Sequence, residues 1–121
     1  MNEKVKLEDL KSALSRLKDG IGIAKNDLDR DGVIQRFEFT FELVWKAIQE
    51  HARLSGLDVV SPRDAFRVAA DLKLIENPEE WFVFLKDRNE TAHLYSESRA
   101  REIFSHIPTF IKNVESLVSK L

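Results

Sequence analysis

Three residues that could do chemistry together lie within one eight-residue segment: Arg88, His93 and Tyr95. A histidine can gain or lose a proton near neutral pH, an arginine can hold a phosphate through two hydrogen bonds, and a tyrosine hydroxyl can be modified. These types suit cleavage of an RNA phosphodiester without a metal ion. His93 would activate the 2′-hydroxyl or protonate the leaving oxygen, while Arg88 would stabilise charge on phosphorus.

The spacing of this segment sets a geometric condition on such a site. On a regular helix, Arg88 and His93 would lie about 140° apart around the axis and would not share a face. The helix must therefore bend, or a second subunit must complete the site. A purely structural interpretation is also open: Arg88 could pair with Asp87 or Glu90, and His93 could be a cation near a helix C-terminus.

A second candidate site is a match to the calcium-binding loop of an EF-hand. Asp27, Asp29, Asp31 and Glu38 stand at the carboxylate positions of that twelve-residue pattern, and Gly32 stands at its glycine position. EF-hands usually work in pairs, however, and the chain has no second copy of the pattern. Turns rich in aspartate and glycine are also common between helices, so the alternative is an acidic turn that precedes the second helix.

The composition limits the classes of protein to which the chain can belong. Its 121 residues, 43% hydrophobic and 33% charged, predict a single globular domain over 1–121. The chain has no cysteine, which excludes disulfides, thiolate nucleophiles and zinc sites built on cysteine. No apolar stretch of about twenty residues and no secretory leader is recognisable, so we expect a cytoplasmic protein that does not enter a membrane.

The charge balance bears on nucleic-acid binding. The formal net charge is −2, so there is no overall positive field that would hold a nucleic acid through its phosphates. An RNA-binding function would therefore need a local site.

Hydrophobic periodicity predicts an all-α antiparallel bundle of about five helices, with no strand. The predicted elements are a helix from Leu7 to Leu28, a turn across Asn26–Gly32, a helix from about Ile34 to Ile48, a helix opened by Ser61-Pro62 and ending near Leu74, a helix opened by Asn77-Pro78, and a helix from Ser96 to the end, kinked or interrupted at Pro108.

Two of these helices carry unusually many apolar side chains. Phe39, Leu43 and Trp45 widen the apolar surface of the second helix almost around its axis, which favours coverage by a partner subunit. On the fourth helix, Trp81 and the Phe82/Phe84 pair are expected in the core of the monomer, where aromatic residues at helical spacing are usually found.

The order of motifs along the chain resembles the nucleotidyltransferase substrate-binding family of the HEPN fold, also described as HepT-like. Arg88 to Tyr95 resembles the R-x4-6-H-x-Y signature of HEPN ribonucleases. The run from Asp31 to Lys46, the segment Ser61 to Ala65, and Trp81 followed by Asp87-Arg88-Asn89 also resemble the family. The likeness covers nearly the whole chain.

The resemblance implies a symmetric homodimer that pairs with a separate small nucleotidyltransferase chain. In HepT-like members the pair acts as toxin and antitoxin: the HEPN chain is a metal-independent ribonuclease, and its partner silences it by adding AMP to the motif tyrosine. Arg88 and His93 would then be catalytic, Tyr95 modified, and Asp87 and Asn89 supporting. No cofactor is implied, and the transferase chemistry would belong to the partner.

A second interpretation of the same family is a non-catalytic subunit that binds the nucleotide or acceptor substrate of the transferase. On this view Arg88 and His93 line a groove together with four residues of the second helix: Arg36, Glu38, Glu42 and Lys46. These four could equally form a solvated helix face with a Glu42–Lys46 pair. The resemblance also assigns residues 32–38 to the start of this helix, leaving the three aspartates before them as turn residues.

Overall fold

The computed structural model describes residues 3–121, with side chains from Leu7 onward. This part of the chain is all-helical, as predicted, and the first two residues of the predicted domain lie outside it. Its elements are α1 (Glu3–Ile23), α2 (Asp27–Leu54), α3 (Pro62–Asp71), α4 (Pro78–Glu90), the 3₁₀ turn η1 (Thr91–His93) and α5 (Glu97–Val118). Within residues 3–121, no helix is both long and apolar enough to cross a bilayer.

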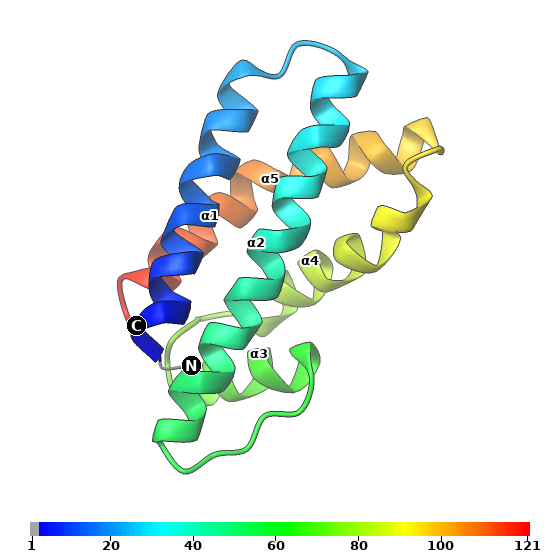
Figure 1. Cartoon of the computed structure of the whole chain (residues 1–121). Helices are drawn as coiled ribbons and strands as arrows, with labels where there is room; N and C mark the ends of the chain where they lie inside the picture. Colours follow the sequence, from blue (N-terminus) through cyan, green and yellow to red (C-terminus); the bar gives the residue numbers. More distant parts are fainter. Residues whose placement is uncertain (1–2) are drawn as a thin grey trace.

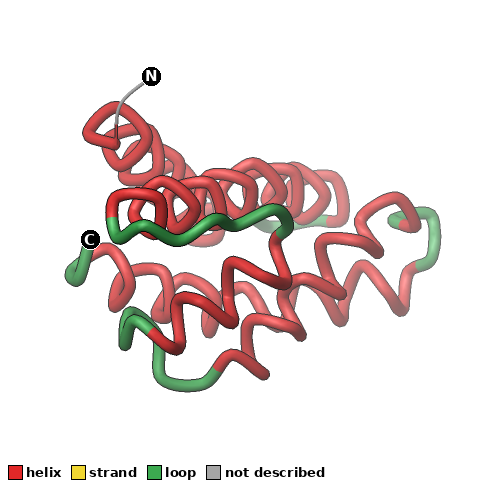
Figure 2. The backbone as a smooth tube through the Cα atoms, turned by 90° about the horizontal axis from the view of Figure 1, so that it is seen from below, coloured by secondary structure: helices red, strands yellow, loops and turns green. Residues whose placement is uncertain are grey.

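The helices form two layers. Helices α1 and α2 run antiparallel as a long hairpin, and α5 crosses behind them (Figure 1). Seen from below, α4 and α5 lie in a layer of their own beside that hairpin (Figure 2). A salt bridge of 2.8 Å between Lys18 and Glu115 joins α1 to α5 across the two layers. The antiparallel α4 and α5 are connected by η1, which places the Arg88–Tyr95 segment at one end of the molecule.

Two helices begin where their capping residues predict. Ser61 accepts a hydrogen bond from the backbone N–H of Asp64 at 3.2 Å, and Asn77 accepts one from Glu79 at 3.0 Å. Each cap satisfies a backbone donor that has no partner within its helix, and a proline follows at the first helical position. Pro108 lies inside α5, which continues through it without interruption.

The prediction of a turn across Asn26–Gly32 is wrong. Helix α1 ends at Ile23, and the side chain of Asn26 caps α2 by accepting a hydrogen bond from the backbone N–H of Asp29 at 2.9 Å. Helix α2 therefore begins at Asp27, and Leu28, predicted for the first helix, belongs to the second and is 81% exposed.

The start of α2 also contradicts the interpretation of residues 27–38 as a calcium-binding loop. All twelve residues are helical. A helix turns successive side chains about 100° around its axis, so their carboxylates cannot encircle one ion as an EF-hand loop does. The carboxylates also have other roles: Asp27 and Asp31 pair with Arg30, and Asp29 accepts the backbone N–H of Lys25.

A cluster of aromatic rings fills the core between the layers. Phe110 of α5 lies edge-on to Phe37 at 4.8 Å between centroids, and Trp81 stacks on Phe66 at 5.0 Å. Trp81 and Phe84 are buried, as predicted for the core, whereas Phe82 is only half-buried. Rings packed edge-to-face or offset gain about 1 kcal/mol per pair beyond their buried area.

The broad apolar surface of α2 is largely covered within one chain. Leu43 and Trp45 are half-buried against the core, and Phe39 is half-buried with the guanidinium of Arg16 above its ring at 5.7 Å. The need to cover this surface is therefore a weaker argument for a partner subunit than the sequence suggested.

Candidate functional site

The backbone leaves the regular helix between Arg88 and His93. Helix α4 ends at Glu90, and the hydroxyl of Thr91 donates to the carbonyl of Arg88 at 2.8 Å, which satisfies one of the free carbonyls at the helix end. One 3₁₀ turn then carries the chain to His93, whose carbonyl accepts the backbone N–H of Ser96 at 2.9 Å. The helix therefore breaks within the motif, which is one of the two arrangements that the spacing of the motif allowed.

His93 and Tyr95 form a pair on the surface. The Nδ1 atom of His93 lies within hydrogen-bond distance of the Tyr95 hydroxyl, at 3.0 Å, and the two rings meet edge-on with centroids 5.6 Å apart. The Tyr95 side chain is 82% exposed. Because Nδ1 is engaged, Nε2 is the nitrogen of His93 that is available to a substrate, and the hydroxyl of Tyr95 is accessible to a modifying enzyme.

Arg88 turns toward α2 and faces Glu42. Its Nε lies 3.6 Å from Oε1 of Glu42, which is an ion-pair distance but too long for a hydrogen bond. This Nε is buried without a hydrogen-bond partner. The other carboxylate oxygen of Glu42 accepts the indole N–H of Trp45 at 3.1 Å, so Glu42 is held on one side and presents its charge to Arg88 on the other.

Asp87 is oriented away from Arg88 and is buried against α5. Its Oδ2 lies 2.6 Å from Nδ1 of His106. Burial raises the pKa of Asp87 above its ordinary value, while the hydrogen bond and charge of His106 oppose that rise. The pair fixes α4 to α5 one residue before Arg88. The alternative pairing of Arg88 with Asp87 or Glu90 does not occur, because Glu90 lies 3.5 Å from Arg99 instead.

The residues of the motif are gathered at one end of the bundle but do not form a closed site within one chain. Among residues 3–121, no hydrogen bond or ion pair joins Arg88 to His93, and Asn89 is exposed. A hollow of about 250 Å³ lies beside them between α4 and α5. Its charges are mixed, since it is lined by Lys86, Asp87, Glu90, Arg99, Glu102 and Ile103.

The four predicted binding residues of α2 divide into two groups. Arg36 faces α1, where its guanidinium donates to the carbonyl of Arg16 at 2.6 Å and lies close to the backbone of Gly20. Glu38, Glu42 and Lys46 recur every four residues and share the other face of the helix. Glu42 alone of these contacts a motif residue, and its partner is Arg88 rather than Lys46.

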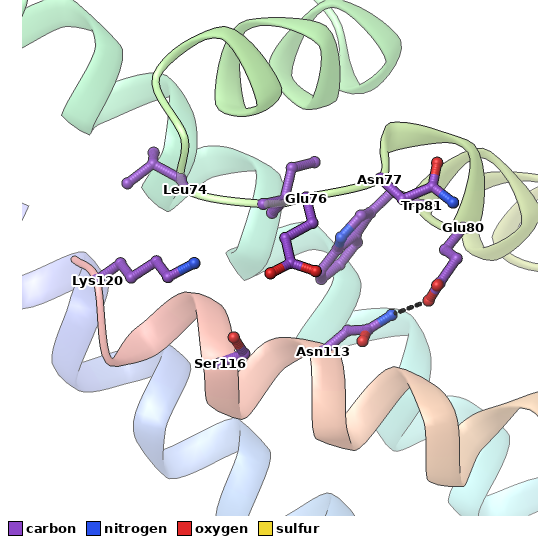
Figure 3. A pocket seen from close by; sticks show the side chains of 9 residues that line it. Leu74, Glu76, Asn77, Glu80, Trp81, Asn113, Ser116 and Lys120 are labelled. Carbon is purple, nitrogen blue, oxygen red and sulfur yellow. Dashed lines mark hydrogen bonds between the residues drawn. The ribbon is translucent and has the colours of Figure 1, made fainter.

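Another hollow, of about 170 Å³, lies at the opposite end of α4 (Figure 3). Trp81 lies in the first turns of α4 at this hollow, and Asn113 of α5 donates to Glu80 across it at 2.7 Å. This hollow is lined by none of the residues of the Arg88–Tyr95 motif, so it is separate from the candidate site.

Sequence reasoning missed two residues that shape the site, His106 and Trp45. His106 is nineteen residues from Asp87, and Trp45 was assigned only to an apolar face. Helical periodicity indicates which residues share a face of one helix. It does not indicate which residues of different helices meet.

Comparison with known proteins places the chain in a family. The sequence profile described as "Nucleotidyltransferase substrate binding protein like" matches residues 5–121. A Haemophilus influenzae protein named Probable ribonuclease HepT is 27% identical over 95 residues, which cover 74% of this chain and 65% of that protein. The chain thus matches only part of the length of that relative.

Two solved structures share the fold. A Thermus thermophilus protein is 33% identical, with a TM-score of 0.87 over 92% of this chain and 97% of its own. A Haemophilus influenzae protein, described as having the fold of a substrate binding domain of a nucleotidyltransferase, is 22% identical, with a TM-score of 0.83 over 93% of this chain and 96% of its own. By the extent of the profile match and this shared fold, the chain belongs to the nucleotidyltransferase substrate-binding protein family.

Proposed function

We propose that this chain is a metal-independent endoribonuclease that acts as a homodimer beside a separate small nucleotidyltransferase chain, which silences it by transferring AMP to Tyr95. The observation that carries the proposal is the His93–Tyr95 pair at 3.0 Å, exposed at the end of α4 where Arg88 also lies. Cleavage of RNA requires a histidine with one free ring nitrogen and a nearby arginine. Silencing by AMP transfer requires an accessible tyrosine. The name of the Haemophilus influenzae relative supports the same activity.

The cleavage step can be written with the residues present. Nε2 of His93 takes the proton of a 2′-hydroxyl, whose oxygen attacks the adjacent phosphorus. The bond from phosphorus to the 5′-oxygen breaks, which leaves a 2′,3′-cyclic phosphate and a 5′-hydroxyl. Arg88 stabilises the negative charge on the phosphoryl oxygens in the transition state. The leaving 5′-oxygen takes its proton from a second imidazole, His93 of the other subunit.

The open geometry of the motif supports the proposal of a homodimer. Arg88 and His93 do not contact each other within one chain, and Tyr95 is 82% exposed. Two such surfaces facing each other across a two-fold axis would supply two imidazoles and two guanidinium groups to one strand, and would concentrate positive charge that a chain of net charge −2 otherwise lacks. Light scattering of the purified protein tests the mass of a dimer.

The silencing step uses the exposed hydroxyl of Tyr95. In the active site of the partner chain, the hydroxyl of Tyr95 loses its proton to water and its oxygen attacks the α-phosphorus of ATP. The bond from the α-phosphorus to the bridging oxygen breaks and pyrophosphate leaves, so that AMP remains on the tyrosine. The new phosphodiester would then occupy the position beside His93 that a substrate phosphate needs. Its negative charge would also repel RNA.

The test is cleavage of a mixed pool of single-stranded RNA and tRNA by the purified protein in chelator. Arg88→Ala and His93→Ala should each abolish cutting, whereas Arg101→Ala, an exposed arginine of α5 that pairs with Glu97, should cut as the native chain does. Cutting that persists in both motif variants comes from another protein and rejects the proposal.

A second candidate is a non-catalytic subunit that binds the substrate of the transferase. The description of the family and of the second solved structure favours it, as does the mixed charge of the hollow beside Asp87. The same assay separates the two functions. Absence of cutting by the native chain, together with faster AMP transfer by the nucleotidyltransferase when this chain is added, would establish the binding subunit.

A further inference from the structure

Two arginines of α3 converge on one aromatic ring of α4. The guanidinium carbons of Arg63 and Arg67 lie 4.7 Å and 5.9 Å from the centroid of the Phe82 ring. Both arginines are exposed and the ring is half-buried. Residues four apart share a helix face, so the two cations reach the ring from the same side of α3. We call these three residues the arginine–phenylalanine cluster.

The positive charge of the arginine–phenylalanine cluster is not neutralised. Among the side chains that the structure describes, from Leu7 to Leu121, neither Arg63 nor Arg67 has a carboxylate within ion-pair distance. The nearest carboxylate in sequence, Asp64, is turned toward the start of α3, where it accepts the backbone N–H of Val60 at 3.3 Å. Five other arginines do face carboxylates: Arg30, Arg53, Arg88, Arg99 and Arg101.

The position of Arg63 also works against the stability of α3. Arg63 is the second residue of that helix, where the helix dipole is positive and a cation is unfavourable. Ser61 and Pro62 before it are good helix-starting residues, so the rest of this helix start follows the usual preferences. Departures from a local preference within an otherwise consistent segment are expected at functional sites.

Phe82, the aromatic member of the cluster, lies on the same helix as Arg88. Phe82, Leu85 and Arg88 follow each other at intervals of three residues, so neighbouring side chains of this row are adjacent on the surface of α4. Phe82 and Arg88 lie about 9 Å apart along the helix axis and about 120° apart around it, so a strand that reaches both follows this row obliquely across the surface. At a rise of about 3.4 Å per nucleotide, the axial distance alone corresponds to two or three nucleotides of a stacked strand.

We propose that the arginine–phenylalanine cluster binds the backbone phosphates of a single-stranded RNA whose scissile phosphate lies at Arg88 and His93. This inference rests on the ribonuclease function proposed above and assigns the subsite that holds the strand. Planar guanidinium groups hold phosphates through paired hydrogen bonds, and a partly exposed aromatic ring can stack on a base. An acidic protein surface could pair with the two arginines but would not need the Phe82 ring as a stacking surface, so RNA matches the cluster better.

The test measures binding rather than cutting. Each variant is made on the His93→Ala chain, and its affinity for a short fluorescein-labelled single-stranded RNA is followed by anisotropy at several salt concentrations. Arg63→Ala with Arg67→Ala should bind at least about tenfold more weakly at low salt, and the slope of log K against log salt should fall by about 1.4, since each lost phosphate contact removes about 0.7.

Two matched variants identify the cause of any loss. Arg63→Lys with Arg67→Lys retains both charges and should keep the salt slope while losing part of the affinity, because lysine cannot stack or bind in a fork. Arg16→Ala removes an arginine that lies over Phe39 on the α1–α2 side of the bundle and should bind RNA as the parent does. Thermal melts establish that each variant is folded.

The outcomes separate this inference from the proposed function. Unchanged affinity for RNA and an unchanged salt slope in the double alanine variant overturn the proposed RNA subsite. If that variant also no longer co-elutes with the nucleotidyltransferase chain, the cluster is a protein interface instead. Weakened RNA binding supports the subsite. If the native chain binds RNA through the cluster but cuts none, the subsite stands and only the ribonuclease function is rejected.

Discussion

The Nδ1 atom of His93 and the hydroxyl oxygen of Tyr95 lie 3.0 Å apart, so the proposed general base and the proposed modification site share one hydrogen bond. Any group attached to the hydroxyl would replace its proton and change this contact directly. Under the proposed function, this arrangement would couple control of the protein to the residue on which its chemistry depends, without a conformational change elsewhere in the bundle.

Tyr95→Phe separates the two roles of this pair. The variant keeps the ring but loses one hydrogen bond to His93, which is worth about 1 kcal/mol, so cleavage should fall by no more than about tenfold. Transfer of labelled AMP from ATP by the partner chain should be abolished, because the acceptor oxygen is gone. Label that still appears on the Tyr95→Phe variant would place the modification on another residue.

Glu42→Gln tests whether Glu42 positions Arg88. Glutamine has nearly the same shape and can still accept the indole N–H of Trp45, but it loses the charge that faces the guanidinium. Because the pair is partly exposed and screened by solvent, the effect should be moderate: kcat for cleavage should fall about tenfold through misplacement of Arg88, with a smaller change in KM.

The control for that experiment is Glu38→Gln, one helical turn earlier on the same face. The described residues give Glu38 no ion pair or hydrogen bond through its side chain, so this change should leave both kinetic constants near their native values. Equal losses in the two variants would mean that the overall charge of the α2 face, rather than the position of Arg88, affects the reaction.

The burial of Asp87 makes a prediction about pH. Its pKa is raised by burial, so its contribution to stability is fully present below the ordinary value of 3.8 and is lost as pH rises through the folded-state pKa. The free energy of unfolding of the native chain relative to Asp87→Asn should therefore decrease with rising pH across this range. Urea unfolding of the two proteins at a series of pH values measures it.

Glu97 should show the opposite dependence on pH. Arg30 holds it with two contacts, Nη1 to Oε1 at 2.7 Å and Nη2 to Oε2 at 3.3 Å, and lowers the pKa of the carboxyl below 4.5. The stabilisation is therefore present above pH 4.5 and is lost as pH falls through the folded-state pKa.

The corresponding variant is Glu97→Gln. It should melt below the native chain at about pH 7, and the two melting temperatures should converge in acid. Glu8→Gln, an exposed glutamate of α1, should melt with the native chain at both values of pH. A gap between the native chain and Glu97→Gln that stays constant into acid would contradict the ion pair.

The helical conformation of residues 27–38 predicts indifference to calcium. A ligand that binds only the folded state raises the melting temperature by mass action, and a well-occupied site gives a shift of several degrees. We expect identical melting temperatures in calcium and in chelator. A rise in calcium that disappears in Asp29→Asn would show that the start of α2 can rearrange into a metal-binding loop.

The fold was predictable because helical periodicity and caps act locally. The caps at Ser61 and Asn77 lie where the sequence indicated. The turn before α2 was misplaced because aspartates and a glycine favour turns by composition, whereas the side chain of Asn26 decides where the helix begins. One capping hydrogen bond outweighed the average turn preference of the residues that follow it.

The candidate site was predictable in its residues but not in their partners. The spacing of Arg88, His93 and Tyr95 identified the segment and required either a break in the helix or a second subunit, and the 3₁₀ turn is such a break. The contacts of Arg88 with Glu42 and of Asp87 with His106 join different helices, and they depend on the packing of the layers. Periodicity within one helix contains no information about that packing.

The two tryptophans of the chain are placed in very different surroundings. Trp81 is buried and stacked on Phe66, whereas Trp45 is half-buried and donates its indole N–H to the carboxylate that faces Arg88. We therefore expect their fluorescence to report on separate events: emission from Trp81 on the integrity of the core, and emission from Trp45 on changes at Glu42 and Arg88. With phenylalanine in place of Trp81, the protein would carry a single built-in optical probe beside its candidate site.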